Sequence, residues 1–501
     1  MKTIDTEICI LGGGPAGSVI ARQLARLGHD VLMVDRGFQE GRLRAESLAP
    51  SIVPILDSLQ LGAAVEAAVF ARESRALLSW EGGSIQEKWF VKGPFILVER
   101  PRLDAIFRRA AAEAGACILH PALGRRPQQV FRGGWRIEIV TANGGINVAT
   151  RFLVDARGKR RRENWSTRDS VRTAALSAIW QTGGPLTETR IEAGSDEWFW
   201  GSPLPRNQYM ATIFLDPKRV GGLSTNRRAD IVRFLISRTK LLRTLECEEM
   251  IHPPTVRDAS ASIATDLIGT NFIRVGEAAV AIDPLASQGI QRAIISAIQG
   301  SAAVHTLLSE SSDQALEFYC GRQQDASLQA SQHAARLYAL CAATERNSFW
   351  QRRAHAAREG PIAVPPKSSA RIALPPNVCL SPAVRIVEVA VLSGNRVSRA
   401  RALSHPDLEH PVAYLSGEPL APLVGEAIGA KPVEQILCRW AMRMPIERAR
   451  AIARWMYQVG ILIPFGSRMN SGDRSRTNGC AGYLRSAGPP HPMRASELRC
   501  R

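Results

Sequence analysis

The sequence predicts an α/β protein with a Rossmann-like nucleotide-binding core, an inserted β-sheet domain and a small, mainly helical C-terminal domain. Three observations lead to this prediction. A buried strand at 7–11 runs into a glycine-rich turn, a helix and a second strand within the first 36 residues. A second strand–turn–helix with glycines follows at 272–308. Between the two lies a long, aromatic-rich stretch of alternating polarity, which is typical of an inserted sheet.

The turn after the first strand has the spacing of a dinucleotide-binding motif, G-x-G-x-x-G. Gly12 permits the tight turn, Gly14 lets a pyrophosphate approach the backbone, and Gly17 lets the helix pack close to the strand. The helix N-terminus offers free N–H groups and a positive dipole end to phosphates. Asp35 ends the second strand, where an acid binds the ribose hydroxyls of an adenosine.

Length and composition describe a globular chain of more than one domain. The chain has 501 residues, of which 45% are hydrophobic and 22% charged, and this length suggests two or three domains. No apolar run approaches the roughly 18–20 residues that span a bilayer, and the early first strand leaves no room for a signal peptide. Nine scattered cysteines without metal-ligand spacing indicate free thiols. We expect a cytoplasmic protein without a metal site or a membrane contact.

The formal net charge of +18 is the one unusual bulk property. Nucleic-acid binding would explain it, but the basic residues are mostly arginines spread along the chain. The densest runs, 159–162 and 352–353, contain no interleaved aromatics. We therefore expect no nucleic-acid partner and attribute the charge to arginine-rich composition, with an anionic cofactor and an acidic partner as secondary causes.

After the first unit, the pattern alternates between helix and strand. An amphipathic helix is expected at 51–61, after a loop at 42–50. Another is expected at 101–114, where Pro101 suits the first turn and Gly115 ends it. Strands are expected at 75–80, 86–91, 95–99, 129–131, 135–140 and 151–154.

An acid-glycine turn ends the last of these strands. Asp155 followed by Gly158 suits a second cofactor contact at the ligand-binding edge of the sheet. The strand-like, aromatic-rich stretch at 173–215 then begins the inserted sheet domain, which we place at about 170–265, with a helix at 229–242.

The chain then returns to the nucleotide sheet. The strand at 272–275 ends in Gly276 and Glu277, and a further turn at 282–289 leads into a helix at 290–308.

The C-terminal part is predicted to be separate from the 1–360 domain. A long helix at 313–343 ends in a turn at 346–350, and the Pro-rich segment 361–376 marks a linker. Residues 377–465 form a small domain with a winged-helix outline, and 466–501 have the composition of a disordered tail. The elements expected in the small domain are helices at 433–442 and 446–459 and a strand at 461–463.

Taken together, residues 5–355 resemble the flavoprotein monooxygenases of the aromatic-hydroxylase fold and, within them, the flavin-dependent tryptophan halogenases. An Arg four residues ahead of an Asp matches Arg100 and Asp104, and the turn at 283–289 resembles the family's turn beneath the isoalloxazine ring. Glu277 is one methylene longer than the family's Asp. The resemblance implies FAD as the cofactor. The FAD contacts it implies are Gly12, Gly14, Pro15, Ala16, Gly17, Asp35, Arg36, Arg44, Arg100, Asp155, Gly158, Gly276, Glu277, Pro284, Gly289 and Ile290.

The halogenases also carry W-x-W-x-I-P, which matches Trp198 and Trp200 but has Ser202 in place of the Ile. Core aromatics of a sheet would give the same residue types, but the motif's place in the chain favours a substrate pocket lined by both tryptophans. Two departures oppose halogenation. Ala281 replaces a Phe of the family, and residues 70–80 lack the lysine that activates hypohalous acid.

A non-halogenating branch resembles this chain more closely: the flavoproteins that hydroxylate a protein tryptophan during maturation of tryptophylquinone-containing amine dehydrogenases (the quinohemoprotein type) or amino-acid oxidases. The turn at 282–289, the run 349–353 and the small C-terminal domain are similar. This branch implies hydroxylation of a tryptophan in a protein or peptide through a flavin C4a-hydroperoxide. Electrons would come from NAD(P)H or from a separate flavin reductase. The resemblance assigns no catalytic residue.

Three other functions stay open from the sequence. A halogenase would give bromide-dependent product, and a flavoprotein dehydrogenase or reductase for lipid-like substrates would incorporate no oxygen from O₂. A non-catalytic FAD-binding partner protein would bind FAD and turn nothing over.

Overall fold

The chain divides into two compact units, residues 1–359 and 360–501, and each is described by itself. The computed structural model describes residues 2–37, 45–80, 84–130, 133–159, 165–166, 171–310, 312–343, 347–356 and 373–465. The predicted linker lies almost wholly outside these ranges, and the predicted tail lies entirely outside them.

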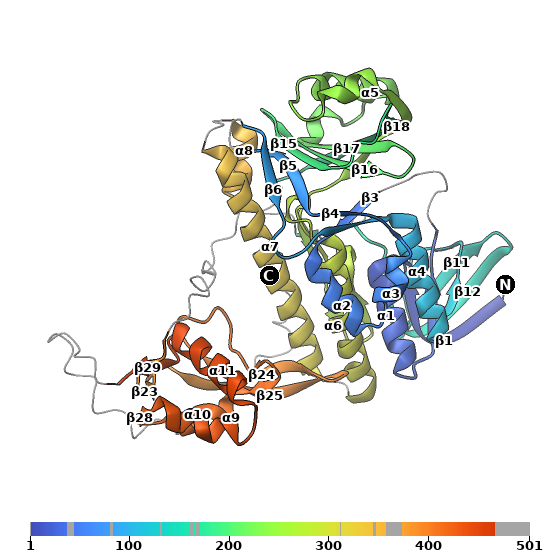
Figure 1. The fold of residues 1–501 in the computed structure, drawn as a ribbon. Helices are drawn as coiled ribbons and strands as arrows, with labels where there is room; N and C mark the ends of the chain where they lie inside the picture. The colour runs from blue at the N-terminus through green and yellow to red at the C-terminus, as the bar shows by residue number, and fades with distance from the viewer. Residues whose placement is uncertain are drawn as a thin grey trace. The chain divides into compact units, whose positions relative to one another are not determined.

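The first unit is built on a parallel sheet. β1 (Lys2–Leu11) lies between β2 (Val31–Val34) and β12 (Gly144–Asp155), and both run parallel to it. β8 (Cys117–Leu119) and β21 (Phe272–Arg274) extend the parallel part. Figure 1 shows β1 and β12 side by side. The last four residues of β1 are completely or almost completely buried, as expected where both faces of a sheet are covered.

Helices cover the sheet next to the glycine turn. α1 (Pro15–Arg26) packs against α4 (Arg100–Glu113) and α6 (Gly289–Glu310), and α7 (Asp313–Ala342) packs on α6. Side chains of β11 (Trp135–Thr141) join alternate residues of β1 in a second core cluster. The predicted helices at 101–114, 290–308 and 313–343 are confirmed to within a few residues.

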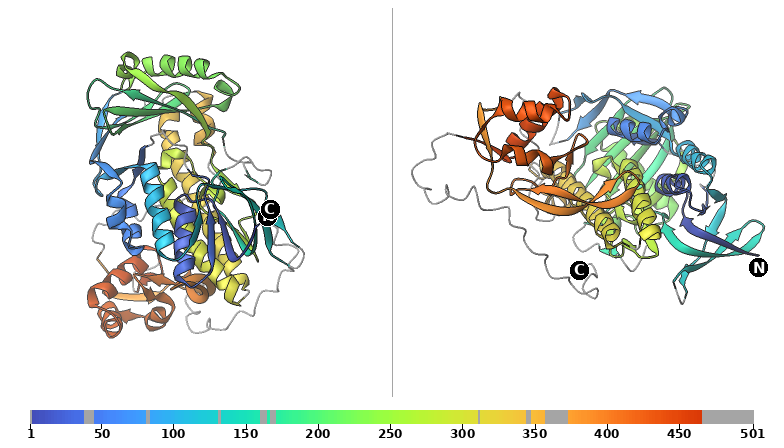
Figure 2. Two further views of the ribbon diagram at one scale, coloured as in Figure 1. Left: turned by 90° about the vertical axis from the view of Figure 1, so that its right-hand side faces the viewer. Right: turned by 90° about the horizontal axis from the view of Figure 1, so that it is seen from below.

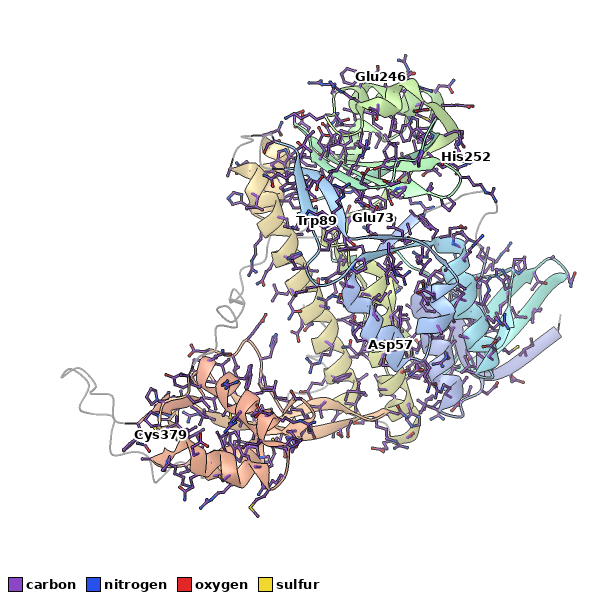
Figure 3. The ribbon with its side chains drawn as sticks, viewed as in Figure 1. Asp57, Glu73, Trp89, Glu246, His252 and Cys379 are labelled. Carbon is purple, nitrogen blue, oxygen red and sulfur yellow. The ribbon has the colours of Figure 1, made fainter. Side chains whose placement is uncertain are left out.

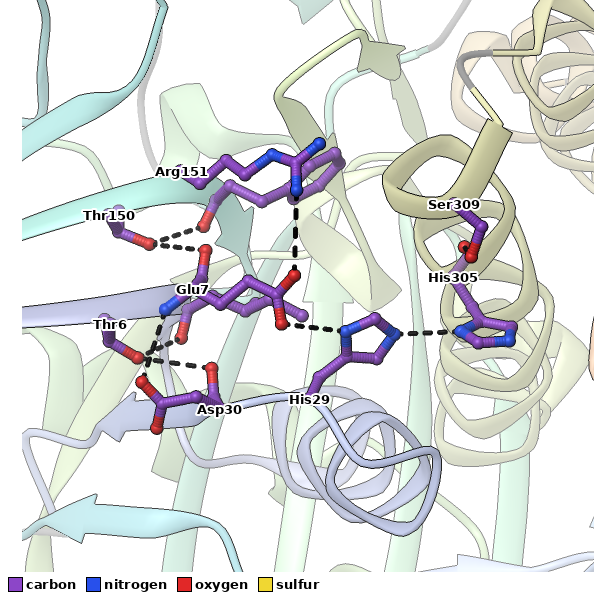
Figure 4. Close-up of polar contacts among 10 residues, drawn as sticks. Thr6, Glu7, His29, Asp30, Thr150, Arg151, His305 and Ser309 are labelled. Atoms are coloured by element: carbon purple, nitrogen blue, oxygen red, sulfur yellow. Dashed lines mark hydrogen bonds and ion pairs between the residues drawn. The ribbon is translucent and has the colours of Figure 1, made fainter.

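A series of polar side-chain contacts links α6 to β1. It lies near the C-terminal end of α1, away from the glycine turn. His29 follows α1, and its Nδ1 lies 2.9 Å from Oε2 of Glu7 on β1. Its Nε2 lies 2.9 Å from Nδ1 of His305 on α6 (Figure 4). Thr150 of β12 donates to the carbonyl oxygen of Glu7 at 3.0 Å. These contacts fix the position of α6 relative to β1.

A seven-stranded sheet forms the predicted substrate region. Its order is β18-β14-β17-β16-β15-β5-β6, and α5 (Thr225–Ser237) covers one face (Figure 2). The strands are β14 (Ala174–Gln181), β15 (Thr189–Ala193), β16 (Glu197–Leu204), β17 (Gln208–Leu215), β18 (Glu249–Asp258), β5 (Arg75–Ser79) and β6 (Gln86–Trp89). The stretch at about 170–265 therefore supplies five strands, and the two others come from earlier in the chain.

A separate three-stranded sheet corrects the prediction for residues 42–50. The described part of that predicted loop contains β3 (Ala45–Leu48), which pairs with β7 (Phe95–Glu99), while β4 (Val69–Glu73) pairs with the other edge of β7. The partner of β3 is about fifty residues away, so local pattern could not reveal it.

The helix predicted at 51–61 is broken in the structure. After a 3-10 turn (Pro50–Ile52) come two short helices, α2 (Val53–Ser58) and α3 (Gly62–Glu66). Gln60 has φ 58°, a left-handed conformation that does not continue a right-handed helix.

Shorter elements complete the first unit. The predicted turn at 346–350 is instead the start of α8 (Ser348–Ala354), which Asn347 caps by accepting from the Phe349 N–H at 2.8 Å. The remaining strands are β9 (Ala122–Gly124), β10 (Gln128–Gln129), β13 (Trp165–Ser166), β19 (Ser262–Ala264), β20 (Ile268–Gly269) and β22 (Val280–Ala281).

The C-terminal unit has its own core, which includes the buried side chains of Trp440 and Met456. The predicted helices and strand correspond to α10 (Val433–Ala441), α11 (Ile446–Gln458) and β29 (Leu462–Pro464). The sequence did not predict the long antiparallel hairpin of β24 (Arg385–Ser393) and β25 (Arg396–Ser404) or the short elements of this unit. The short elements are β23 (Asn377–Leu380), β26 (Tyr414–Leu415), β27 (Glu418–Pro419), β28 (Lys431–Pro432) and α9 (Leu420–Val424).

Candidate cofactor and substrate site

Two motif glycines of the turn at the end of β1, Gly12 and Gly17, are required by the protein itself. Gly12 has φ +108°, and a Cβ there would lie 2.4 Å from the carbonyl oxygen of Ala156. A Cβ on Gly17 would lie 1.8 Å from the carbonyl oxygen of Gly12. Close packing of backbone on backbone therefore explains both positions.

Gly14 differs, because a Cβ there would meet only Nη2 of Arg100, at 3.8 Å. The protein leaves open the space that a pyrophosphate would occupy. Gly14 is also the N-cap of α1, with no side-chain cap in the structure and Pro15 at the first helical position. Uncapped N–H groups at this end suit an anionic ligand. The residues present therefore fit the phosphates of FAD.

Asp35 lies at the end of β2, beside the glycine turn. Its Oδ1 accepts from the backbone N–H of Gly13 at 3.3 Å, and its Oδ2 accepts from Arg108 at 3.1 Å. Nδ1 of His120 lies 3.1 Å from the same Oδ2. These contacts orient the carboxylate that the sequence assigns to the ribose. Two further residues that were predicted to contact FAD follow Asp35 in the chain, Arg36 and Arg44. Arg36 is exposed, and Arg44 lies outside the described residues.

Arg100 is the first residue of α4, and the fold brings it to Gly14. Its Nε donates to Asp104 at 2.9 Å and its Nη1 to Glu46 at 2.9 Å. Burial alone would lower the pKa of Arg100, but the carboxylates of Glu46 and Asp104 raise it overall. The guanidinium therefore stays charged beside the open space at Gly14. Glu46 was missed from sequence because β3 was expected to be a loop.

Asp155 ends β12 with its carboxylate engaged by protein groups. It is 1% exposed, accepts from Nε of Arg157 at 2.8 Å and from Nη1 of Arg274 at 3.0 Å. A cofactor contact at this position stays a prediction, and Asp155 has a structural role that the sequence did not indicate.

The turn that contains Gly276 and Glu277 lies next to the turn that contains Asp155 and Gly158. A Cβ on Gly158 would lie 3.8 Å from Oε2 of Glu277, and Gly158 has φ +69°. Gly276 has φ +63°, and a Cβ there would lie 2.6 Å from Cβ of Ala16 on α1. The structure thus brings together predicted residues that are more than 250 positions apart in the chain.

The turn that leads into α6 is held by Asp283. Its carboxylate accepts from the Leu285 N–H at 3.0 Å and caps the 3-10 turn Pro284–Ala286. Gly289 then begins α6, and the following Ile290 is buried. Ser287 has φ 48° between them. The sequence predicted this turn but not the hydroxyl of Tyr338, which donates to Asp283 at 3.2 Å.

The two predicted pocket tryptophans lie on the face of the seven-stranded sheet opposite α5. Trp198 is 3% exposed and stacks on Phe214, with ring centroids 3.9 Å apart. Its Nε1 donates to the Tyr338 hydroxyl at 3.2 Å. Trp200 is partly buried and contacts the same cluster. Trp198 therefore forms part of a packed aromatic wall, here called the aromatic cluster: Trp80, Trp198, Phe214, Tyr338, Phe349 and Trp350.

Residues 70–80 are the segment in which the resemblance places the lysine of a halogenase. The arginines in this segment form ion pairs with glutamates. Arg72 donates to Glu66 at 2.6 Å, and Arg75 donates to Glu87 at 2.5 Å. Lys88 is exposed on β6. Ala281 is buried in β22.

A cavity of about 250 Å³ lies elsewhere, beside α5. It is lined by side chains that include Glu192, Glu197 and Leu235, and by none of the predicted site residues.

In the part of the chain that the structure describes, no helix combines the length and apolarity needed to cross a bilayer. The same residues contain no group of three His, Cys, Asp or Glu side chains arranged to hold a metal ion.

Comparison with known proteins identifies an FAD-binding domain in the first part of the chain. The FAD binding domain family model matches residues 5–121. The tryptophan 2-halogenase of Chondromyces crocatus is 28% identical over 354 residues, which cover 63% of this chain and 64% of the halogenase. The chain therefore spans just under two thirds of that relative's length.

Two solved structures share the fold over nearly the whole chain. The peptidyl tryptophan dihydroxylase QhpG, essential for tryptophylquinone cofactor biogenesis, has a TM-score of 0.69 at 24% identity, covering 91% of this chain and 100% of its own. The flavin-dependent halogenase CmlS has a TM-score of 0.72 at 17% identity, covering 94% and 99%. The predicted fold class, the FAD cofactor and the class of FAD-dependent oxidoreductases are confirmed by the comparisons together.

Proposed function

We propose that this chain is an FAD-dependent monooxygenase that hydroxylates the indole ring of a tryptophan side chain within a polypeptide. The observation that carries the proposal is a single hydrogen-bonded connection between the aromatic cluster and the turn before α6. Trp198 on the seven-stranded sheet and Asp283 of that turn bond to the same Tyr338 hydroxyl. An aromatic surface is thus held beside the turn that the family resemblance assigns to the flavin ring.

The protein's own residues would bind and orient the cofactor. The open space at Gly14, the uncapped α1 N-terminus and the charged Arg100 suit a pyrophosphate, and Asp35 suits the ribose. When bound and reduced, FAD supplies the electrons that activate O₂ for transfer to an aromatic ring. The aromatic cluster would exclude water from that face of the sheet.

A halogenase is the second candidate, and the 28% identity to a tryptophan 2-halogenase favours it. Halogenation requires the lysine that the resemblance places near residues 70–80. The arginines there, Arg72 and Arg75, are engaged by Glu66 and Glu87 and differ from lysine in shape and acidity. These observations favour oxygenation.

Three considerations support a polypeptide substrate. The solved structure of QhpG belongs to a peptidyl tryptophan dihydroxylase, which makes tryptophylquinone biogenesis the process we propose. The C-terminal unit, whose described part includes 377–465, has a core of its own, so we propose that it folds separately and helps to hold the polypeptide substrate. The net charge of +18 would speed encounter with an acidic polypeptide. Electrons would come from NAD(P)H or from a separate flavin reductase.

Halide competition tests the choice between the two candidates. The FAD-loaded protein is incubated with a tryptophan-containing peptide, reductant and O₂, with and without bromide, and product masses are measured. We expect a gain of oxygen that bromide leaves unchanged. A brominated indole formed at a rate comparable to oxygenation would replace the proposal with a halogenase.

A further inference from the structure

One hydroxyl group joins the substrate sheet to the turn before α6. The Tyr338 hydroxyl on α7 accepts from Nε1 of Trp198 at 3.2 Å. It also lies 3.2 Å from each carboxylate oxygen of Asp283. Asp283 in turn accepts from the Leu285 N–H at 3.0 Å. Three elements from distant parts of the chain therefore meet at Tyr338, which is 2% exposed.

The donors and acceptors give this chain of hydrogen bonds a single direction. An indole N–H can only donate, so Tyr338 must accept from Trp198. The hydroxyl proton is then free to donate to Asp283 when that carboxyl group is ionised. A protonated Asp283 would still offer one carboxyl oxygen to the Tyr338 hydroxyl, but a neutral acceptor forms a weaker hydrogen bond than a charged one. The chain is therefore strongest when Asp283 is ionised.

The surroundings of Asp283 have opposite effects on the pKa of its carboxyl group. Burial raises the pKa of Asp283, whereas the hydrogen bonds from Leu285 and Tyr338 and the positive charge of Arg353 lower it, and the net effect is a raised pKa. Arg353, on α8, is 3% exposed and donates to Thr173 at 2.9 Å. Tyr338 from α7, Arg353 from α8 and the Leu285 N–H are the groups that act on this carboxyl group in the described residues.

We propose that Tyr338 is a positioning residue that holds the turn at 283–289 in register with the aromatic cluster through the chain Trp198 N–H to Tyr338 O–H to Asp283 carboxylate. This inference deepens the proposed function and rests on it, because the resemblance places the flavin ring over that turn. Protonation of Asp283 would weaken the chain and remove a negative charge near the ring.

The test uses the full-length, FAD-loaded protein and does not need turnover. The absorbance spectrum of the bound oxidised flavin is recorded over the whole pH range in which FAD stays bound, in wild type and Tyr338→Phe. Tyr209→Phe is the matched control, since Tyr209 is also fully buried and bonds one carbonyl oxygen at 3.0 Å, but on the α5 side of the sheet. A charge close to the ring shifts the flavin bands.

In wild type we expect one spectral transition, from Asp283. Loss of the Tyr338 hydrogen bond removes stabilisation of the ionised form, so the transition in Tyr338→Phe should move to higher pH by about one unit. Tyr209→Phe should keep the wild-type transition. An unmoved transition in Tyr338→Phe, alongside a loss of thermal stability equal to that of Tyr209→Phe, would reduce Tyr338 to a purely structural role and overturn the proposal.

Asp283→Asn keeps the proposal falsifiable if Tyr338→Phe fails to retain FAD. Its amide oxygen can still accept from Tyr338 but cannot titrate, so its flavin spectrum should not change over the same pH range. A transition that persists in Asp283→Asn would overturn the inference. Both results are independent of product formation and therefore separate from failure of the proposed function.

Discussion

A Cβ on Gly17 would lie 1.8 Å from the carbonyl oxygen of Gly12, inside the turn that joins β1 to α1. Neither the carbonyl group nor the helix can move without disturbing the parallel sheet, since Gly12 donates its N–H to Val34 at 2.8 Å. Gly14, two residues from Gly12, has no such constraint from the protein. The same motif therefore contains two glycines that the fold requires and a third, Gly14, that the fold does not require and that we propose the ligand does.

Substitutions at these glycines should separate stability from cofactor binding. Gly17→Ala should destabilise the apoprotein by about 1–3 kcal/mol or more through overpacking, together with a loss of FAD. Gly14→Val should leave apoprotein stability close to wild type and weaken FAD binding by at least about tenfold. Urea unfolding and FAD titration measure the two effects. A Gly14→Val protein that purifies with normal FAD content would contradict the assignment of this turn.

The ion pair between Asp155 and Arg274 should matter for stability rather than for FAD. Both side chains are buried, at 1% and 6% exposed, and removing one partner from a buried pair costs about 3–5 kcal/mol. The loss of stability in Asp155→Asn should lie near the lower end of this range, because Arg274 keeps its ion pair with Asp266, in which Nη2 lies 2.7 Å from Oδ2. The measurement is urea unfolding of the apoprotein.

Arg109→Ala is the matched control for that measurement, because Arg109 forms an exposed pair with Glu113 and should change stability by at most about 0.5 kcal/mol. If Asp155→Asn weakened FAD binding while apoprotein unfolding stayed at the wild-type value, the carboxylate would be a cofactor contact and not a structural group.

Glu73 should make stability depend on pH. This residue ends β4 close to the seven-stranded sheet (Figure 3), and its Oε2 accepts from Thr189 at 2.5 Å. Its Oε1 has no hydrogen-bond partner among the described residues. Burial raises the pKa of Glu73 more than the Thr189 hydrogen bond lowers it. The folded protein therefore binds the Glu73 proton more tightly than the unfolded chain does.

It follows that wild-type stability falls as pH rises from about 4 through the raised pKa, with about 1.4 kcal/mol lost for each unit of difference between the folded and unfolded pKa. Glu73→Gln lacks this loss. The free energy of unfolding of Glu73→Gln minus that of wild type should increase between about pH 4 and about pH 8. Glu113→Gln, at an exposed site, should show no such increase, and a constant difference for Glu73→Gln would show that its pKa is unchanged by folding.

The contrast between what the sequence predicted and what it missed has a physical origin. β1, α1 and β2 were predicted because a contiguous stretch contains the apolar run, the glycines and the terminal acid. Glu46 and Tyr338 reach the site through pairing and packing with partners more than fifty residues away, and periodicity does not report such contacts. Trp198 was predicted from a motif, but its burial in an aromatic cluster depends on α7 and α8.

The C-terminal unit should affect activity on a polypeptide more than activity on free tryptophan. β23 (Asn377–Leu380) belongs to its core sheet, so the truncation should end the chain at residue 359, where the two units divide. We expect the truncated protein to keep FAD and activity on free tryptophan and to lose at least about tenfold in kcat/KM on a peptide. A parallel fall in FAD content and both activities would mean that this unit is structural.

The central claim is that this chain transfers oxygen from O₂ to a tryptophan side chain in a polypeptide. It is tested most directly by mass spectrometry of a tryptophan-containing peptide after incubation with the FAD-loaded protein, a reductant and ¹⁸O₂. Our account predicts fragment ions in which the tryptophan residue, and no other, has gained ¹⁸O in each step of the reaction. Consumption of reductant with an unlabelled, unmodified peptide and an unmodified tryptophan control would contradict it.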